Sequence, residues 1–192
     1  IILHNLDQEV LILSTEIVGS ERSTIVRFIP FPSEPGVSLA RGRPFEAVAE
    51  LIKKHGLKFS FHSKRESIGA GSPIRQGKPV DIRLHVRLGA HDATVVKINE
   101  PPAFGRWVRQ FFSEKELNLA RGFRKVEEVA RDYVQRGFQY FVFDLVEVPR
   151  EPKAVSPLVY RFKTSRLYYP LKTSNTFGGK GGIDLFIVAP VT

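Results

Sequence analysis

The pattern of hydrophobic and polar residues along the first part of the chain predicts β-strands. Residues 9–18 and 23–31 are rich in β-branched and aliphatic side chains, and the turn residues 19–22 separate them. This arrangement is typical of two antiparallel strands around a short turn. Pro30 and Pro32 are expected to end the second strand, because proline cannot donate to a strand ladder.

Alternation is strictest at residues 80–88. Its apolar residues face one way and its polar residues face the other. The apolar set is Ile82, Leu84, Val86 and Leu88, and the polar set is Asp81, Arg83, His85 and Arg87. A turn follows at 89–92 and residues 93–99 return as a second strand, so the pattern predicts a hairpin.

Helical periodicity occupies the middle of the chain. Residues 44–55 begin at a proline and stop before a glycine, as helices commonly do. Residues 101–112 carry apolar side chains at i, i+3, i+4, i+7 and i+8, which predicts one strongly apolar face. A Ser-x-x-Glu capping box at 113–116 predicts a new helix start, and a third helix is expected near 123–136.

Further strands are predicted at 57–62, 138–148, 158–164, 167–171 and 183–190. Strands therefore dominate both ends of the chain and helices lie between them. That order favours an α+β fold with an antiparallel-rich mixed sheet and three or so helices packed on one side. The length of 192 residues suits a single domain, 1–192.

The charge of the chain is strongly positive and unevenly distributed. The formal net charge is +9, and residues 53–87 hold nine basic against two acidic residues, a net of +7. A basic patch attracts polyanions such as nucleic acid, anionic lipid head groups or acidic polymers. The alternative is that the charge only keeps the protein soluble.

Cysteine, methionine and long apolar segments are missing from the sequence. The lack of cysteine excludes disulfides, thiol nucleophiles and Cys-ligated metal sites. The lack of an initiator methionine leads us to expect that the given residues start downstream of the translational start, either because a leader was removed or because the sequence was shortened. No stretch reaches the roughly 18 apolar residues of a membrane helix, so no membrane span is expected in this segment.

The GGKGG stretch at Gly178–Gly182 is the first candidate for chemistry. A phosphate-binding loop requires Ser or Thr after the lysine and a helix whose N-terminus binds the phosphates. Here Gly181 follows Lys180 and a strand-like stretch comes next. We interpret these residues as a turn between strands, with a flexible flap bearing one cation as the alternative.

The histidines and carboxylates match no known metal or catalytic motif. Four of them lie close enough in sequence to gather around a metal ion: Asp81, His85, His91 and Asp92. The arginines on either side of His85 argue against a cation there, so we predict no metal and no cofactor. Asp144 and Glu147 differ in strand parity, which makes them a poor catalytic pair.

A resemblance to a known family runs through most of the chain. It rests on the stretches LILSTEIVGSERSTIVRFIPFPSEP, LGAHDATVVKIN, WVRQFF, YFVFDLVEV and PLVYRFKTSRLYYPLK. Together they resemble a family of uncharacterised archaeal and bacterial proteins, a domain of unknown function found largely in predicted exported or membrane-anchored precursors. The resemblance implies an extracytoplasmic or cell-surface domain and carries no catalytic residues.

These observations favour a non-enzymatic binding or structural domain with a basic face. The expected partner is a protein, a cell-surface component or a polyanion, and the candidate contacts are Arg83, His85, Arg87 and His91. A nucleic-acid-binding protein is the alternative, which is not favoured. The third hypothesis is an enzyme of unrecognised type that uses His91, Asp92 or the loop 63–79.

Overall fold

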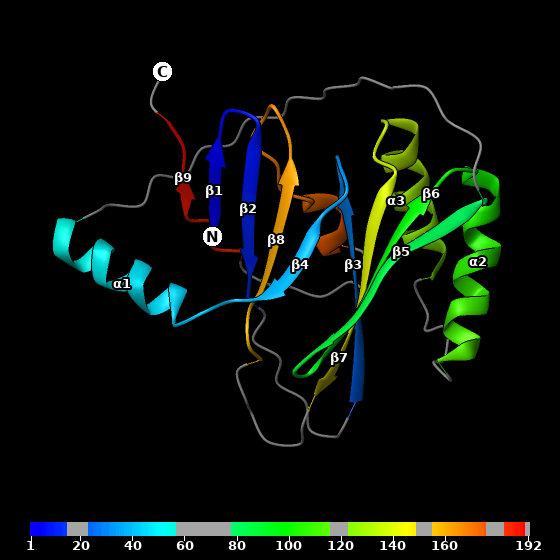
Figure 1. Ribbon diagram of the computed structural model, residues 1–192, viewed down its shortest axis with the longest axis horizontal. Helices are drawn as coiled ribbons and strands as arrows, with labels where there is room; N and C mark the ends of the chain where they lie inside the picture. Colours follow the sequence, from blue (N-terminus) through cyan, green and yellow to red (C-terminus); the bar gives the residue numbers. More distant parts are fainter. Residues whose placement is uncertain (15–22, 57–77, 116–122, 149–154, 176–182, 191–192) are drawn as a thin grey trace.

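The computed structural model describes residues 1–14, 23–56, 78–115, 123–148, 155–175 and 183–190. Within these ranges the chain forms nine β-strands, three α-helices and one 3₁₀ helix (Figure 1). The strands are β1 (Ile2–Asn5), β2 (Gln8–Leu13), β3 (Ser23–Phe31), β4 (Gly36–Leu39), β5 (Val80–Leu88), β6 (His91–Ile98), β7 (Tyr140–Val148), β8 (Leu158–Lys163) and β9 (Ile187–Val188). The helices are α1 (Pro44–His55), α2 (Pro101–Glu114), α3 (Phe123–Gln135) and the 3₁₀ helix η1 (Leu171–Asn175).

The strands form two sheets where the sequence predicts one. The first sheet has the order β4-β8-β2-β1-β9, and the second has the order β3-β7-β6-β5. The pairing is antiparallel throughout, except between β1 and β9. The predicted α+β class with antiparallel-rich, mixed pairing is confirmed. That the whole chain is a single domain stays a prediction.

The predicted hairpin of residues 9–18 and 23–31 is wrong. β2 pairs with β1 and β8, whereas β3 pairs with β7 over nine residue pairs. β3 and β7 carry apolar side chains on both faces, and a sheet with a core on each side buries both sets. Pro30 lies inside β3 and is tolerated there because β3 is an edge strand.

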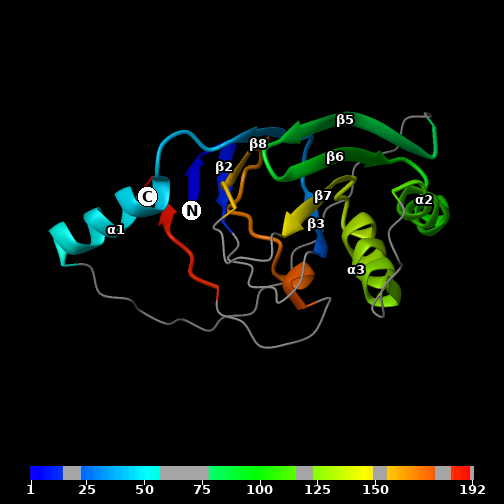
Figure 2. The ribbon, with the colours of Figure 1, turned by 90° about the horizontal axis from the view of Figure 1, so that it is seen from below.

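One hydrophobic core lies between the two sheets. Figure 2 shows β2 and β8 of the first sheet beside β3 and β7 of the second. The buried members of this core are Ile2, Leu11, Ile29, Phe31, Ala93, Val95, Val142, Leu158, Tyr160 and Phe162. The ring of Phe31 lies 5.1 Å from that of Tyr160 and 5.0 Å from that of Phe162. Burial of this apolar surface stabilises the packing of one sheet against the other.

A second core lies between the opposite face of the β3-β7-β6-β5 sheet and helices α2 and α3. Phe104 and Phe111 of α2 contact the ring of Phe143 in β7, at centroid distances of 6.2 and 5.5 Å. This confirms the predicted apolar face of α2. Helix α1 has no buried residue and projects from the other side of the molecule, near β1 and β9 (Figure 1). The expectation of helices on one side therefore holds for α2 and α3 only.

Two strands predicted near the C-terminus are absent or shorter. Residues 167–171 are irregular and lead into η1, and residues 183–190 contribute only β9. The backbone N–H of Tyr168 donates to Oε2 of Glu9 at 2.9 Å, and its hydroxyl donates to the carbonyl oxygen of Pro30 at 2.8 Å. These side-chain bonds replace the strand pairing that alternation alone predicts.

Some predicted features lie outside the described residues. They are the strand at 57–62, residues 63–77 of the predicted functional loop, the glutamate of the capping box at 113–116, and Gly178–Gly182.

The end of α3 depends on a glycine. Gly137 has a φ of 86°, and its N–H donates to the carbonyl oxygen of Val134 at 3.0 Å. A side chain in this left-handed region is strained by the approach of its Cβ to the backbone. We expect Gly137→Ala to lower the free energy of unfolding in urea by about 1 kcal/mol. Gln135→Ala, an exposed change in the same helix, is expected to alter it by less than about 0.5 kcal/mol, and equal losses would contradict the conformational explanation.

Candidate functional site

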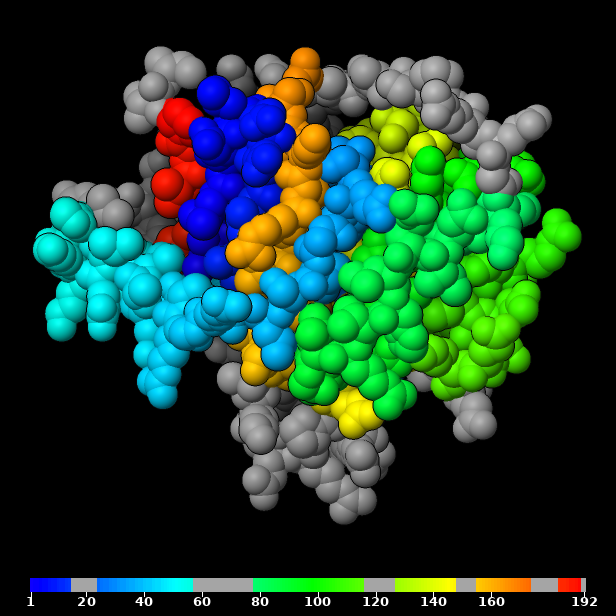
Figure 3. Space-filling view, in the orientation of Figure 1, coloured from blue at the N-terminus to red at the C-terminus, as the bar shows by residue number. Residues whose placement is uncertain are grey.

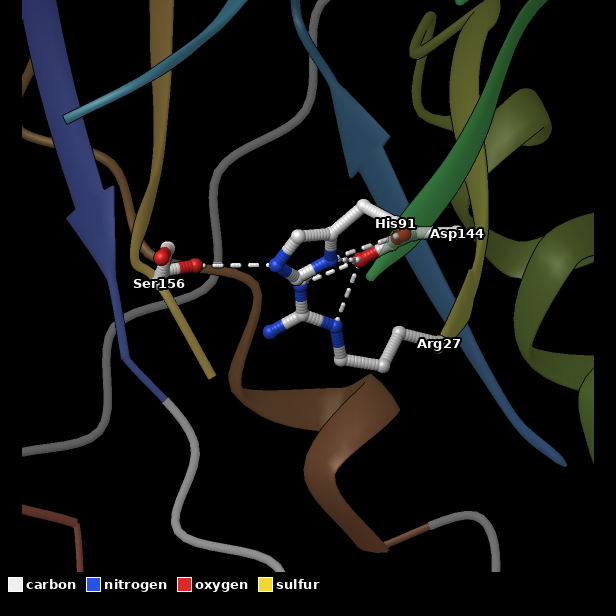
Figure 4. Close-up of polar contacts among 4 residues, drawn as sticks. All are labelled: Arg27, His91, Asp144 and Ser156. Atoms are coloured by element: carbon white, nitrogen blue, oxygen red, sulfur yellow. Dashed lines mark hydrogen bonds and ion pairs between the residues drawn. The ribbon is translucent and has the colours of Figure 1, made fainter. Parts of the chain in front are cut away.

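Three polar side chains meet on the face of the second sheet that points toward the first (Figure 4). Arg27 of β3 lies directly across from Asp144 of β7, and His91 enters from the first position of β6. Arg27 Nε donates to Asp144 Oδ2 at 2.8 Å, and Arg27 Nη2 also bonds to that oxygen. His91 Nδ1 lies 3.0 Å from the same carboxylate oxygen. We call these three residues the buried polar cluster.

Both ring nitrogens of His91 are engaged by neighbours. Nε2 faces the carbonyl oxygen of Ser156 at 2.9 Å, and a carbonyl can only accept, so Nε2 carries a proton. Nδ1 lies within reach of the Asp144 carboxylate and, at 3.2 Å, of Arg27 Nη2. When protonated it donates to Asp144, and when unprotonated it accepts from Arg27. Neither nitrogen is therefore free to take a proton from a substrate.

The ionised form of Asp144 is favoured in this cluster. Complete burial by itself raises the pKa of Asp144, but the hydrogen bond from His91 and the charge and hydrogen bonds of Arg27 outweigh it. The net result is a pKa below the ordinary value for aspartate. Arg27 and His91 thus compensate the buried negative charge of Asp144. A charged group is tolerated in a protein core when its neighbours compensate it in this way.

The buried polar cluster has the features of a structural site and not of a catalytic one. His91 is 2% exposed and Asp144 is fully buried. His91 contacts the backbone carbonyl oxygen of Ser156 and not its hydroxyl group. The arrangement is therefore not that of a catalytic serine and histidine. The bond from His91 holds the residues just before β8 against the second sheet. His91 was predicted to lie on the exposed basic face, and its burial corrects that prediction.

A β-bulge divides β5 into two parts. Ile82 pairs with Val96 of β6, but Leu84 pairs with the adjacent Val95. Because neighbouring residues of β6 point to opposite faces, the bulge places Ile82 and Leu84 on opposite faces as well. The side chains of both remain substantially exposed. The prediction that the apolar residues of 80–88 share one face is therefore wrong.

The bulge also separates the predicted basic residues. Arg83 turns to Glu34, which follows β3, and its Nε donates to both carboxylate oxygens at 3.1 and 3.2 Å. His85 and Arg87 lie beyond the bulge and contact Asp92 on β6. The four predicted contacts therefore fall in three places, and only His85 and Arg87 remain together.

His85, Arg87 and Lys115 surround a single carboxylate, that of Asp92. Lys115 Nζ, at the end of α2, donates to Oδ2 at 2.8 Å, His85 Nε2 lies 2.5 Å from Oδ1, and Arg87 Nε lies 3.9 Å from Oδ2. Partial burial raises the pKa of Asp92, but the hydrogen bonds and charges of Lys115 and His85 outweigh it and lower the pKa overall. Arg87 is 80% exposed. We call these four residues the Asp92 cluster.

A groove of about 520 Å³ opens on the first sheet. It is lined by residues 8–10 of β2, by Ser33 and Glu34, and by residues 161–163 of β8. Neither His91 nor Asp92 contributes to it. The Arg83–Glu34 ion pair joins its wall to β5.

The described part of the chain contains no group of three or more His, Cys, Asp or Glu side chains arranged to hold a metal ion. The four residues that the sequence suggested as possible metal ligands do not gather at one place. His91 and Asp92 point to opposite faces of β6, and Asp81 accepts a hydrogen bond from Asn99 at 2.9 Å. None of the helices within the described ranges is long and apolar enough to cross a membrane.

Sequence reasoning missed Arg27 and considered Asp144 only as part of a poor catalytic pair, although the sequence carries a signal for both residues. Both are charged residues inside otherwise apolar strands, RSTIVRFIPF and FQYFVFDLVEV. Opposite charges within two strongly apolar strands indicate a buried pair, because an unpaired charge is rarely buried. Glu9, which is 1% exposed, was missed as well, since its stretch reads as an ordinary strand start.

The fold and these sites define an α+β protein with a polar cluster buried between its two sheets. Comparison with protein families assigns the chain more narrowly. It belongs to a family described as uncharacterised proteins conserved in bacteria (DUF2330), whose model matches residues 6–189. No curated protein and no solved structure matches the chain significantly.

Proposed function

We propose that this protein is a non-catalytic binding domain whose Asp92 cluster contacts an anionic partner. The observation that carries this proposal is the imbalance of charge in the cluster. Three basic side chains share one carboxylate, and two of them, His85 and Arg87, are 48% and 80% exposed. An exposed excess of positive charge attracts polyanions and accelerates their association.

Catalysis by His91 and Asp92 has less support. The two residues are adjacent on β6, so their side chains leave opposite faces of the sheet. Both nitrogens of His91 are held by neighbours, and the described groove lies elsewhere. A general base must reach the proton it removes, and His91 does not meet that requirement.

We place the partner outside the cytoplasm, as an acidic polymer of the cell surface. This part of the proposal rests on the resemblance to exported and membrane-anchored precursors. It is tested with the full-length natural protein in intact cells, by adding a protease that does not enter them. Digestion supports an extracytoplasmic site, and complete protection until lysis contradicts it.

Binding to heparin, measured by isothermal titration calorimetry at low and physiological ionic strength, tests the basic contact. We expect saturable binding that weakens steeply with salt, because each cation that contacts the polyanion releases counterions. Arg87→Ala is expected to weaken binding about fivefold at low salt, which corresponds to about 1 kcal/mol for one surface cation. Lys115→Ala in addition should weaken it further.

Arg131→Ala is the matched control. Arg131 is 64% exposed on α3 and lies 3.9 Å from the Glu127 carboxylate, the same separation as between Arg87 and Asp92. Both variants lose one charge, so equal effects would mean that only net charge matters and would contradict a defined site. Single-stranded DNA in the same assay tests the nucleic-acid alternative, which a clear preference for DNA over heparin would favour.

A further inference from the structure

The groove on the first sheet lies on the face that points away from the hydrophobic core. Figure 3 shows β2, β8 and β4 side by side at the surface. In β8 the core-facing Tyr160 and Phe162 are buried, whereas Arg161 and Lys163 between and after them are exposed. Lys163 is paired with Gln8 of β2, so these three polar residues share the outer face.

β4 lacks a side chain at the position beside Arg161, a residue of the groove lining, and this leaves a hollow next to Arg161. Gly36 pairs with Arg161, so a side chain there would point to the same face. A Cβ added to Gly36 would meet only the carbonyl oxygen of Arg161, at 3.9 Å, and the φ of Gly36 is not in the left-handed region. A larger residue therefore fits without strain and occupies the space beside Arg161. On the other side of Arg161, Val10 of β2 supplies an apolar surface.

The groove carries two cations that are not neutralised. Among the described residues, neither Arg161 nor Lys163 forms an ion pair within 4.0 Å. Within the described ranges, the side chain of Arg161 has a single long contact, of 3.4 Å to Ser38 Oγ. Glu34, the acidic residue of the lining that is exposed, is already paired with Arg83. Residues two apart on a strand lie roughly 7 Å from each other on one face, so a small molecule can reach both cations.

We infer that this groove binds a small organic molecule with carboxylate groups. Its volume is within the range of ligand sites, roughly 300–1,000 Å³. The guanidinium of Arg161 matches a carboxylate in two parallel hydrogen bonds, and the ammonium of Lys163 holds a second anionic group. Val10 contacts the apolar part of the ligand, and the Gln8 carboxamide supplies a polar contact. This site is separate from the Asp92 cluster and does not depend on the proposed function.

Glutarate, a dicarboxylate, is the probe, followed by backbone amide NMR at constant ionic strength. We expect saturable shifts at residues 8–10 and 161–163, with butyrate, a monocarboxylate of similar size, binding more weakly. Inorganic phosphate, titrated in the same way, tests whether the groove binds phosphate groups instead of carboxylates. Saturable binding of phosphate without glutarate would overturn the carboxylate assignment. Shifts that chloride reproduces, or no saturation at all, would overturn the site.

Two variants locate the site by different means. Lys163→Gln removes one exposed cation, and Gly36→Val fills the hollow with a strand-favouring residue while leaving every charge in place. Each is expected to weaken glutarate binding by about tenfold or more. Arg87→Ala is expected to leave glutarate binding unchanged and to weaken heparin binding. If Arg87→Ala weakens glutarate as much as Lys163→Gln does, the groove is not the site.

Discussion

Asp144→Asn is expected to lower the free energy of unfolding by about 3–5 kcal/mol at pH 7, measured by urea denaturation. The substitution keeps the shape of the side chain but removes the negative charge that two nitrogens of Arg27, a side chain only 13% exposed, contact. His91 also loses the carboxylate that faces Nδ1. Breaking a buried network of ion pairs and hydrogen bonds is one of the few changes with effects of this size.

Two comparisons isolate the charge of Asp144. Glu50→Gln removes an exposed carboxylate of α1 and is expected to change stability by less than about 0.5 kcal/mol. Replacing the pair by apolar residues, Arg27→Met with Asp144→Leu, should recover most of the loss, because no charge remains to be compensated. A loss below about 1 kcal/mol for Asp144→Asn, or a double variant as unstable as the single one, would contradict this account.

The effect of Asp144 must also depend on pH. Its pKa is lower in the folded state than in the unfolded chain. Its stabilising contribution is therefore present above the ordinary pKa of 3.8 and is lost as the pH falls through the lower, folded value. The difference between wild type and Asp144→Asn should thus shrink as the solution is made strongly acidic, and a difference independent of pH would contradict the role of charge.

Glu9→Gln is expected to stabilise the protein by up to about 3 kcal/mol above pH 8, and to have little effect near pH 4. Burial of Glu9 raises its pKa, and the hydrogen bond from the Tyr168 N–H offsets this in part, with a resulting pKa of about 7. Oε1 has no hydrogen-bond partner among the described residues. The folded state therefore favours the neutral carboxyl group, which a glutamine resembles in charge and shape.

The sign of the Glu9 effect follows from proton binding. Between the ordinary pKa of 4.5 and about 7, the folded state binds more protons at Glu9 than the unfolded state does. This contribution to stability is complete below pH 4.5 and is lost as the pH rises through 7. Thermal unfolding of both proteins across this interval measures the effect. Parallel stability profiles for wild type and Glu9→Gln would show that Glu9 does not titrate in this range.

These two stability effects are separable from the binding tests. Asp144 and Glu9 are buried, whereas Arg87 and Lys163 are exposed on the surface. Substitution of the exposed residues is expected to leave stability within about 0.5 kcal/mol. A loss of heparin or glutarate binding in those variants can therefore be assigned to the contact itself, with unfolding measured as the check.

The sequence predicted the features that depend on local periodicity. The apolar stripe of α2 and the hairpin of β5 with β6 are examples, since the side chains that define them lie within a few residues of one another. The bulge in β5 was not predictable, because strict alternation continues through Arg83 without a break. The bulge has a large effect on the position of the basic side chains, since Arg83 contacts Glu34 whereas His85 contacts Asp92.

By itself the sequence determined the α+β class, most of the strands and helices, and the excess of positive charge. Only the tertiary structure decided which strands pair, that two sheets form, and which charges are buried. The physical reason is that strand partners are selected by burial of surfaces far apart along the chain. Arg27 and Asp144 are separated by 117 residues, and no local pattern relates them. His91 contacts this pair in the interior and therefore does not lie on the predicted basic face.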